Sequence, residues 1–287
     1  MIIVTGAAGF IGRNLVEKLR SSFDDEIVTF DFVGPHRNPT SLFDFIKKNK
    51  ESIKIIFHNG ACSDTTQEDL KYVLDRNADY TIDLVRACVK NNIRLIYASS
   101  ASVYGDGPFC EGTQYSPKNF YAVSKSTVDM YCSMLFEKTS QLVGLRYFNV
   151  YGKYEENKGE MASVVYKFYN QMKSGNIQLF ENSDAYLRDF VYIDDVIEWN
   201  LFFYRNPEYS GIYNVGTGVE RSFEDIANIF KNKYNAKINY IPMPEHLREK
   251  YQEYTKSDNS KSLEVYNHKY NTLEEGVEKY LNYLESC

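Results

Sequence analysis

The chain has 287 residues, 43% of them hydrophobic, and is therefore long enough to bury a large core. Its 33 Lys and Arg against 39 Asp and Glu give a formal net charge of −6 without long blocks of one sign, which argues against nucleic acid and membrane surfaces as partners. Five cysteines without a CxxC pair are typical of reduced thiols, so we expect no metal site. The N-terminus shows no signal-peptide pattern, and no apolar stretch approaches about 18 residues. We expect a cytoplasmic protein of ordinary enzyme size.

Short apolar runs alternate with segments of helical period through the first half of the chain, which predicts βαβ units and a parallel sheet covered on both faces. Beyond about residue 150 the alternation loosens. We predict an α/β fold with a doubly wound parallel sheet in residues 1–150, returns to it near 189–235, and a smaller interleaved lobe mainly in 151–287. The expected strands are 2–5, 26–31, 53–60, 95–99, 142–148, 189–193, 211–216 and 238–241, and the expected helices are 11–21, 69–91, 121–137, 163–175, 194–205, 223–234 and 272–284.

Three glycines, Gly6, Gly9 and Gly12, form a GxxGxxG motif directly after the first predicted strand. Glycines there allow a tight turn and a close approach of the backbone to a pyrophosphate, and the following helix N-terminus offers amide donors. This arrangement in the first βα turn predicts dinucleotide binding by a Rossmann fold, with Phe10 and Ile11 beside the cofactor.

The second predicted strand ends at Asp31, where an acidic side chain usually accepts hydrogen bonds from the adenosine ribose. That carboxylate favours NAD. His36 and Arg37 follow closely and could neutralise a 2′-phosphate, so NADP stays open. Small residues after the third strand would let the backbone approach the cofactor. Further cofactor contacts are therefore expected at Asn59, Gly60, Ala61, Cys62, Ser63 and Asn77.

A YxxxK motif places Tyr121 and Lys125 on one face of a predicted helix. We expect the lysine cation to lower the pKa of the phenol from about 10, so that Tyr121 exchanges a proton with a sugar hydroxyl near neutral pH. Lys125 would also bind the nicotinamide ribose. Ser100, at the end of the fourth strand, is the predicted partner that shares the substrate hydroxyl with Tyr121, although Ser99 and Ser102 lie close in sequence.

Together with these motifs, the runs at 99–105 (SSASVYG), 146–152 (RYFNVYG) and 188–192 (RDFVY) give a chain that resembles the extended short-chain dehydrogenases acting on nucleotide sugars, the NAD-dependent epimerase/dehydratase family. The markers span most of the sequence. Within that family, residues 57–66, 158–164 and 251–255 are most similar to the 6-epimerases of ADP-L-glycero-D-manno-heptose, which supply heptose for bacterial lipopolysaccharide.

The resemblance implies that the chain inverts C6 of ADP-D-glycero-D-manno-heptose by transient oxidation and re-reduction with bound NADP, or with NAD. It implies two acid/base groups, Tyr121 and Lys158, and assembly as a homo-oligomer. The Arg188 guanidinium is suited to a diphosphate because it can bind two oxygens at once. The implied cofactor contacts are Phe32, Arg37, Val150 and Lys158, and the implied substrate contacts are Ser100, Asn149, Glu160, Lys167, Phe180, Glu181, Asn182, Ser183, Arg188 and Tyr251.

The chain also departs from the family pattern. The stretch between Asp31 and Ile53 is short, Phe32 replaces a usual Asn, and Glu160 and Lys167 replace a small Ser and a His. Two alternatives therefore stay open: a related 4-epimerase, dehydrogenase or reductase acting on a GDP- or UDP-sugar, and a non-catalytic NAD(P)-binding sensor. The complete YxxxK motif argues against a sensor. A 4,6-dehydratase is not expected, because residues 100–104 lack its Asp-Glu pair.

Overall fold

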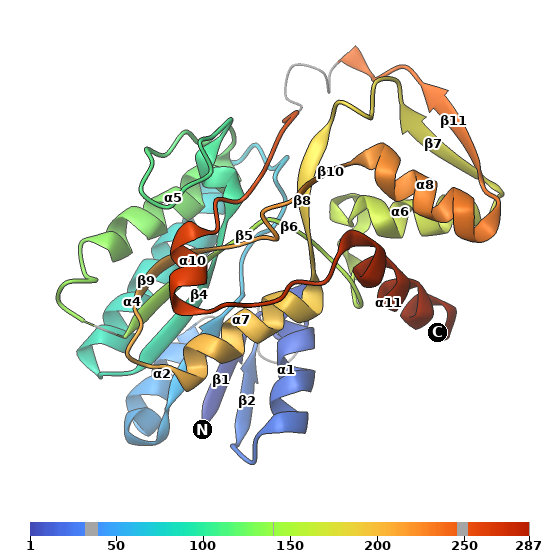
Figure 1. The fold of residues 1–287 in the computed structure, drawn as a ribbon. Helices are drawn as coiled ribbons and strands as arrows, with labels where there is room; N and C mark the ends of the chain where they lie inside the picture. The colour runs from blue at the N-terminus through green and yellow to red at the C-terminus, as the bar shows by residue number, and fades with distance from the viewer. Residues whose placement is uncertain (32–39, 140, 246–251, 287) are drawn as a thin grey trace.

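The computed structural model describes residues 1–31, 40–139, 141–245 and 252–286. Its centre is a six-stranded parallel sheet in the order β2-β1-β3-β4-β5-β9 (Figure 1), which confirms the predicted doubly wound α/β fold. The strand order reverses between β1 and β3, and ligands of such sheets bind there, beyond the carboxyl ends of the strands. The strands are β1 (Ile2–Thr5), β2 (Ile27–Phe30), β3 (Ile55–His58), β4 (Arg94–Ser100), β5 (Leu142–Tyr147) and β9 (Gly211–Val215).

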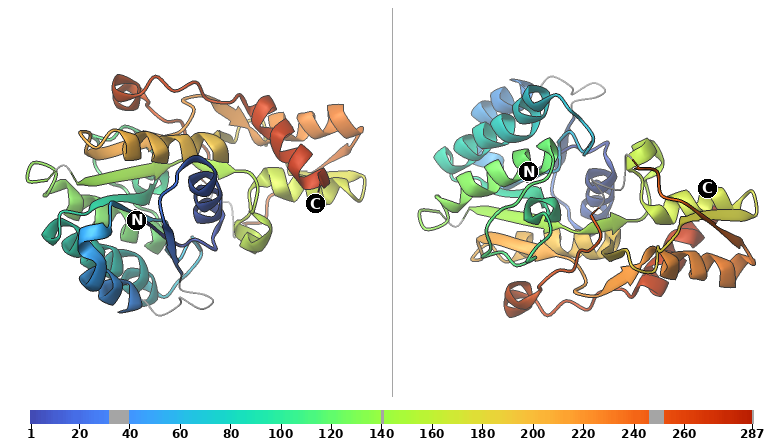
Figure 2. Two further views of the ribbon diagram at one scale, coloured as in Figure 1. Left: turned by 90° about the horizontal axis from the view of Figure 1, so that it is seen from below. Right: turned by 90° about the horizontal axis from the view of Figure 1, so that it is seen from above.

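The sheet is buried between two apolar cores, and strands β1 to β5 each contribute side chains to both of them. Ile2 and Val4 of β1 pack in the core with helices α1 and α7, whereas Ile3 packs in the core with α2, α4 and α5. This follows from the alternation of side chains along a strand. Figure 2 shows the helices on both sides of the sheet. Their bounds are α1 (Phe10–Ser22), α7 (Ile193–Arg205), α2 (Thr40–Asn49), α4 (Tyr80–Lys90) and α5 (Phe120–Ser133).

The edge of the sheet next to β1 is simpler than in the doubly wound order 3-2-1-4-5-6, in which two strands lie outside the first. Here β2 alone lies outside β1 among the described residues, and the described chain from β2 to β3 contains α2 and a short 3₁₀ turn, η2 (Lys50–Ser52). The described residues between β2 and β3 thus add no further strand to this edge of the sheet.

The helix predicted over 69–91 is divided by a π-helical turn. It consists of α3 (Leu70–Val73), the turn η3 (Leu74–Asp79) and α4, and Asp69 caps its start by accepting a hydrogen bond from the Tyr72 amide. Such turns are frequent at functional sites because they redirect side chains within a helix. Asn77 lies in this turn and is 1% exposed.

The smaller lobe lies at one end of the sheet, at the upper right of Figure 1. In it, α6 (Val164–Met172) packs against α8 (Phe223–Tyr234), beside the parallel strands β7 (Asn176–Phe180) and β11 (Lys237–Ile241). A three-stranded sheet connects the lobe to the main sheet, while α7 and β9 return to the main sheet. The remaining elements are β6 (Asn149–Tyr151), β8 (Leu187–Tyr192), β10 (Glu220–Ser222), 3₁₀ helices η4 (Ala101–Tyr104) and η5 (Glu156–Met161), α10 (Ser260–Val265) and α11 (Leu273–Ser286).

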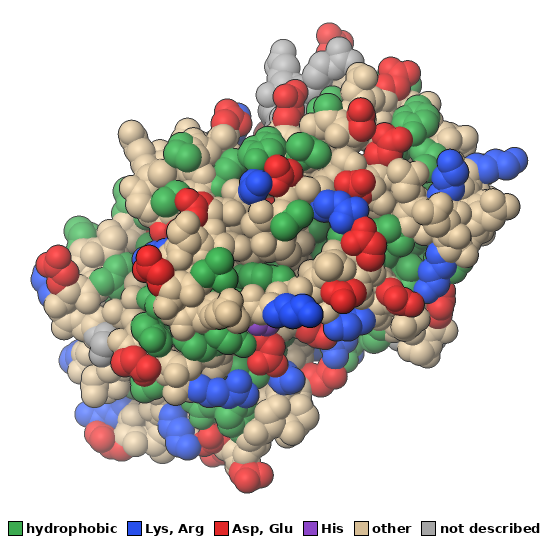
Figure 3. All heavy atoms as spheres, viewed as in Figure 1, with side chains coloured by type: hydrophobic (Ala, Val, Ile, Leu, Met, Phe, Trp, Pro, Cys, Tyr) green, Lys and Arg blue, Asp and Glu red, His purple; other side chains and the backbone are tan. Residues whose placement is uncertain are grey.

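Acidic and basic side chains are interspersed over the face drawn in Figure 3, without a broad area of one sign. In the part of the chain that the structure describes, no helix combines the length and apolar character needed to cross a membrane.

Candidate active site

The GxxGxxG turn is closely packed, and a larger residue is excluded at Gly6 and at Gly12 for different reasons. Gly6 has a φ of +65°, and a Cβ there would lie 2.6 Å from the amide nitrogen of Gly60. A Cβ on Gly12 would lie 2.1 Å from the Gly6 carbonyl oxygen. Helix α1 begins at Phe10 directly after Gly9, which provides no side-chain cap, so the start of the helix follows a turn of glycine and alanine only. This cradle suits a pyrophosphate.

Gly12→Ala is expected to abolish retention of the dinucleotide, because the new methyl group displaces the Gly6 carbonyl and opens the turn. The substitution by itself favours a helix by about 1 kcal/mol, so loss of binding would not reflect loss of α1. Gly112→Ala is the matched control, since no atom lies within 4 Å of its added Cβ. The measurement is the nucleotide released per chain on denaturation. Equal amounts in wild type and Gly12→Ala would contradict this account of the turn.

Two polar side chains border the cradle. The Ala8 amide donates to Asp31 Oδ2 over 2.8 Å, so this carboxylate lies against the glycine turn. Asn59 follows β3, and its Nδ2 is buried without a hydrogen-bond partner among the described residues. A buried donor left unsatisfied costs about 1–3 kcal/mol, and such groups are typical of positions that bind a ligand. The cradle, the helix start and Asn59 together fit a dinucleotide.

Asn77 holds the loop after β3 against the helix that carries the YxxxK motif. Its Oδ1 accepts from the Cys62 amide over 2.8 Å, and its Nδ2 donates to the Cys62 carbonyl over 2.9 Å and to Ser124 Oγ over 3.0 Å. Because both polar atoms are engaged within the protein, the structure gives Asn77 a positioning role. The predicted cofactor contacts at Asn77, Gly60, Ala61 and Ser63 stay predictions.

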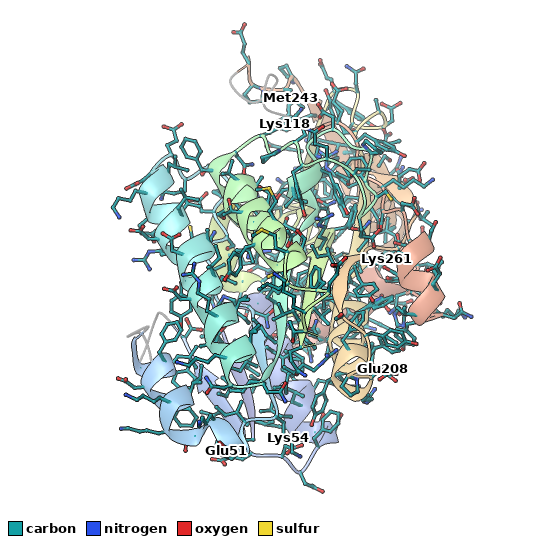
Figure 4. All side chains as sticks on the ribbon, turned by 90° about the vertical axis from the view of Figure 1, so that its left-hand side faces the viewer. Glu51, Lys54, Lys118, Glu208, Met243 and Lys261 are labelled. Atoms are coloured by element: carbon teal, nitrogen blue, oxygen red, sulfur yellow. The ribbon has the colours of Figure 1, made fainter. Side chains whose placement is uncertain are left out.

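Tyr121 and Lys125 lie at the carboxyl edge of the sheet. Helix α5 starts at Asn119, whose side chain accepts from the Ala122 amide over 2.8 Å. Figure 4 shows Lys118, just before this start, at the opposite end of the molecule from Lys54, which precedes β3. The phenol therefore lies where the parallel strands end, at the same edge as the glycine turn.

Lys125 is buried and directed at β4. Its Nζ donates to the Ala98 carbonyl over 2.7 Å and lies 5.7 Å from the centre of the Tyr121 ring. Burial lowers the pKa of Lys125 to about 8, and the Asp129 carboxylate opposes this shift. A lysine with this pKa is partly unprotonated at the upper end of the physiological pH range.

The expected lowering of the Tyr121 pKa is wrong. Burial raises the pKa of this phenol, and a hydrogen bond with Ser100 lowers it only in part. The physical reason is that the Lys125 ammonium is bound by Ala98, so its cation does not offset the loss of water around the phenol.

Ser100 is the serine that the structure places beside Tyr121. Its Oγ accepts from the Ser102 amide over 3.2 Å and from Ser102 Oγ over 2.9 Å. Ser99, by contrast, is 2% exposed and donates to Asp129, away from the phenol. Ser100 and Tyr121 thus present two adjacent hydroxyls to one side of the site.

Lys158 lies over the beginning of α1. Its Nζ is 4.7 Å from the centre of the Phe10 ring and 3.9 Å from Glu155 Oε2. Burial lowers the pKa of Lys158, the Glu155 carboxylate opposes this, and Lys167 lowers the pKa further. The Lys158 amine therefore lies beside Phe10, the residue that follows the glycine turn. Its role at cofactor and substrate stays a prediction.

The segment that carries Lys158 is fixed on both sides. Glu155 is buried and accepts from the Gly152 amide over 2.8 Å and from the Ser163 amide over 2.5 Å. At the other end of the segment, Thr65 Oγ1 donates to Met161 Sδ over 3.7 Å. Because Thr65 belongs to the loop after β3, residues 158–163 extend from the glycine turn to that loop.

The two positions that depart from the family pattern contact each other. Lys167 Nζ donates to the Glu160 carbonyl over 2.7 Å and lies 3.4 Å from Glu160 Oε2. The Glu160 side chain is 94% exposed, and that of Lys167 is 41% exposed. Glu160 and Lys167 thus form a surface ion pair beside Lys158.

The remaining predicted substrate residues lie around β6, β7 and β8. Asn149 Nδ2 donates to the Asp189 carbonyl over 3.2 Å and to Thr255 Oγ1 over 3.1 Å. Arg188 is 7% exposed, and its guanidinium lies 5.5 Å from the centre of the Phe223 ring. Phe180 ends β7, and the turn of Glu181, Asn182 and Ser183 follows, with a buried Ser183 hydroxyl that has no partner among the described residues. Of the predicted cofactor residues, Val150 lies in β6, whereas Phe32 and Arg37 lie outside the described residues. The predicted substrate residue Tyr251 also lies outside them.

Asp189 is a structural residue of the site that the sequence reasoning did not single out. It is fully buried and accepts from the Thr217 amide over 2.7 Å, the Gly218 amide over 2.9 Å and the Ser257 amide over 3.0 Å. It thereby joins β8, which carries Arg188, to the turn after β9. A groove of about 690 Å³ adjoins this turn and contains none of the predicted site residues.

His58 was also missed, although a histidine in an apolar strand is a visible signal. Its ring forms hydrogen bonds with Thr5 Oγ1 (2.6 Å) and Thr81 Oγ1 (2.9 Å), and the Gly60 amide donates to Thr5 Oγ1. Burial, assisted by the charge of Lys125, lowers the pKa of His58 to about 3. The neutral imidazole of His58 therefore stabilises the start of the loop after β3 through its hydrogen bond with Thr5.

Comparison with known proteins agrees with this geometry. Residues 2–216 match the model of the NAD dependent epimerase/dehydratase family. The chain belongs to this family, and it is an NAD-dependent enzyme of the epimerase class, as the motifs predicted.

Individual relatives are more specific. The chain is 44% identical to a Brachyspira hyodysenteriae protein named ADP-L-glycero-D-manno-heptose-6-epimerase, over 99% of this chain and 98% of that protein. The solved Helicobacter pylori protein of the same name has a TM-score of 0.85 and 30% identity, covering 100% of this chain and 96% of that one. UDP-glucose 4-epimerase from Thermotoga maritima shares the fold, with a TM-score of 0.85 at 23% identity over 99% of this chain and 98% of the other.

Proposed function

We propose that this chain is a nucleotide-sugar epimerase that inverts C6 of ADP-D-glycero-D-manno-heptose. The observation that supports the proposal is the placement of two candidate proton-transfer groups near the glycine turn. Tyr121 with Ser100 and Lys125 is on α5 and β4, while Lys158 lies over Phe10 at the start of α1. Relatives with 44% and 30% identity carry the name of this activity, which supports the choice of sugar.

The residues divide the work of inversion between them. A dinucleotide held in the glycine cradle would supply a reversible hydride acceptor for the carbinol carbon. Tyr121 takes the hydroxyl proton on one side, and Ser100 holds the same oxygen. Lys158 exchanges the proton on the other side, aided by a pKa that burial lowers. Loss of the hydroxyl proton to one of these residues and of a hydride to the cofactor would give a ketone, and return of a hydride and a proton would restore the alcohol, so atoms and electrons balance over the cycle.

For the cofactor we propose a retained NAD(P). NADP is the expectation from the family resemblance, and Arg37 would be its phosphate ligand. The position of Asp31 against the glycine turn supports NAD, because a carboxylate there accepts ribose hydroxyls and repels a 2′-phosphate. Mass spectrometry of the nucleotide released on denaturation distinguishes the two.

We further propose a homo-oligomer located in the cytoplasm. Large apolar side chains are exposed on neighbouring helices α3 and α5, among them Leu70 (40%), Met130 (46%) and, at the end of α5, Met134 (61%). Exposed apolar side chains that together form a patch are typical of an interface. The described cysteines Cys62, Cys88, Cys110 and Cys132 are free thiols, which supports a reducing compartment. Light scattering on the purified protein tests the assembly.

The activity is tested by incubating the protein with ADP-D-glycero-β-D-manno-heptose and following the sugar by proton NMR. We expect conversion to a mixture of the two C6 epimers without added cofactor. UDP-glucose and GDP-mannose are the parallel substrates. Turnover of either of these, with ADP-heptose unchanged, would contradict the proposed substrate.

A divergent enzyme for another nucleotide sugar is the second candidate, and the Glu160–Lys167 pair is the observation that favours it. Lys167→Ala should raise KM for the diphosphate substrate by about 5- to 10-fold with kcat nearly unchanged, because a cation beside the site is lost. The melting temperature should fall by less than about 4 °C, since exposed ion pairs contribute little. Lys173→Ala, just beyond the end of α6, is the control. An unchanged KM would show that the Glu160–Lys167 pair takes no part in substrate binding.

A further inference from the structure

A buried ion pair lies beneath the catalytic helix. Asp129 Oδ2 and Arg146 Nε are 2.8 Å apart, and both side chains are fully buried. Asp129 also accepts from Ser99 Oγ over 2.9 Å and from the Tyr97 hydroxyl over 3.1 Å. Of the two terminal nitrogens of Arg146, Nη1 donates to the Tyr104 hydroxyl and Nη2 to the Tyr115 hydroxyl, both over 2.8 Å.

The residues of this network are only a few positions away from the catalytic groups along α5 and β4. Asp129 lies one helical turn beyond Lys125 on α5. Ser99, which donates to Asp129, directly precedes Ser100 on β4, and the ammonium of Lys125 is bound by the carbonyl of Ala98 on the same strand. The contacts of Asp129 and Lys125 therefore fix the position of α5 along β4.

Stability alone gives no reason for these charges, because a buried ion pair is frequently no better for stability than apolar side chains of similar size. Its directional hydrogen bonds do, however, define one geometry. The proton transfer needs such a geometry, since Ser100 and Tyr121 must face the same substrate oxygen.

We propose that Asp129 is a positioning residue of the active site, which with Arg146 holds Ser100, Tyr121 and Lys125 in the arrangement that proton transfer requires. The inference rests on the proposed function for its catalytic readout. Asp129 acts through Ser99 and through α5, and touches neither substrate nor cofactor.

Asp129 also sets the electrostatic surroundings of Lys125. The groups that face the ammonium are Tyr121 and Asp129 from α5, the Ala98 carbonyl from β4, neutral His58 from β3 and the Cys62 thiol from the following loop. Asp129 raises the pKa of Lys125 against the effect of burial. Without this carboxylate the pKa falls, so the ammonium loses its proton at a lower pH.

Asp129→Asn keeps the size of the side chain and removes its charge. We expect kcat to fall by about 10- to 100-fold with little change in KM. We also expect the loss of kcat at alkaline pH, which follows the deprotonation of Lys125, to occur about one pH unit lower. Asp129→Glu should restore the pH profile but not the full kcat. Asp83→Asn, at an exposed acid of α4 paired with Arg86, is the control.

A second readout needs no sugar and separates this inference from the proposed function. Labelling of Lys125 by an amine-selective reagent, followed by peptide mass spectrometry across pH, should show a midpoint near 8 in the wild type and a lower one in Asp129→Asn. Identical midpoints and identical kcat in the two proteins would overturn the proposal. If Asp129→Asn does not fold by circular dichroism, Asp129→Glu carries the test, and a kcat equal to that of the wild type then overturns it.

Discussion

Tyr121→Phe is expected to lower epimerase turnover by about 10²- to 10⁴-fold, the usual contribution of a positioned acid/base group. The substitution removes one oxygen, and with it the hydrogen bond to Ser100, and leaves the ring. The other contacts of the neighbours remain, since Lys125 is held by Ala98 and Ser100 by Ser102. Cofactor retention and melting temperature should therefore match those of the wild type.

The matched control is Tyr131→Phe on the same helix. The Tyr131 hydroxyl accepts from Arg86 Nε over 3.2 Å on the surface, away from the site. Activity should be unchanged in this variant. Full activity in Tyr121→Phe would show that the phenol is not the proton-transfer group and would remove the basis of the proposed mechanism.

Lys158→Met is expected to have an effect of similar size, about 10²- to 10⁴-fold on epimerisation, because inversion needs a proton-transfer group on each side of the carbon. Methionine preserves most of the apolar stem over Phe10. The sign of the pKa shift agrees with this role: burial and the cation of Lys167 lower the pKa of Lys158, so more free amine is present near neutral pH than for an exposed lysine.

The two variants can be told apart by reduction of the bound cofactor, seen as nicotinamide fluorescence on mixing with each C6 epimer. Lys158→Met should respond to one epimer and Tyr121→Phe to the other, because each retains a single acid/base group. Lys153→Met is the control, since this lysine is bound to Glu17 over 2.8 Å. A response of Lys158→Met to both epimers would exclude Lys158 from proton transfer.

Most of the main sheet follows from local patterns. The apolar runs at β1, β3 and β5 and the GxxGxxG turn are visible in sequence because each is a continuous segment with a regular period. Helix α2 was not predicted, although Leu42 and Ile46 lie four residues apart and are buried. The three-residue strands β6 and β10 were not predicted either, because their pairing with β8 depends on segments far along the chain.

The site was predictable where chemistry resides in short motifs, and not where it depends on distant contacts. Tyr121, Lys125 and the glycines come from such motifs, whereas the role of Lys158 came from the family resemblance. Its position over Phe10 joins residues separated by more than half the chain. The contact of Glu160 with Lys167 requires the fold of η5 against α6. The direction of the Tyr121 pKa depends on burial, and spacing in a sequence does not report burial.

The most direct test of the account uses ADP-heptose that carries deuterium at C6. We expect the protein to form both C6 epimers with deuterium still on that carbon, and with no solvent hydrogen incorporated there, because hydride leaves and returns within one closed site. Mass spectrometry and proton NMR of the products give the result. Loss of the label to solvent during inversion would show removal of the hydrogen as a proton and would contradict the assignment of Tyr121 and Lys158 to a hydroxyl.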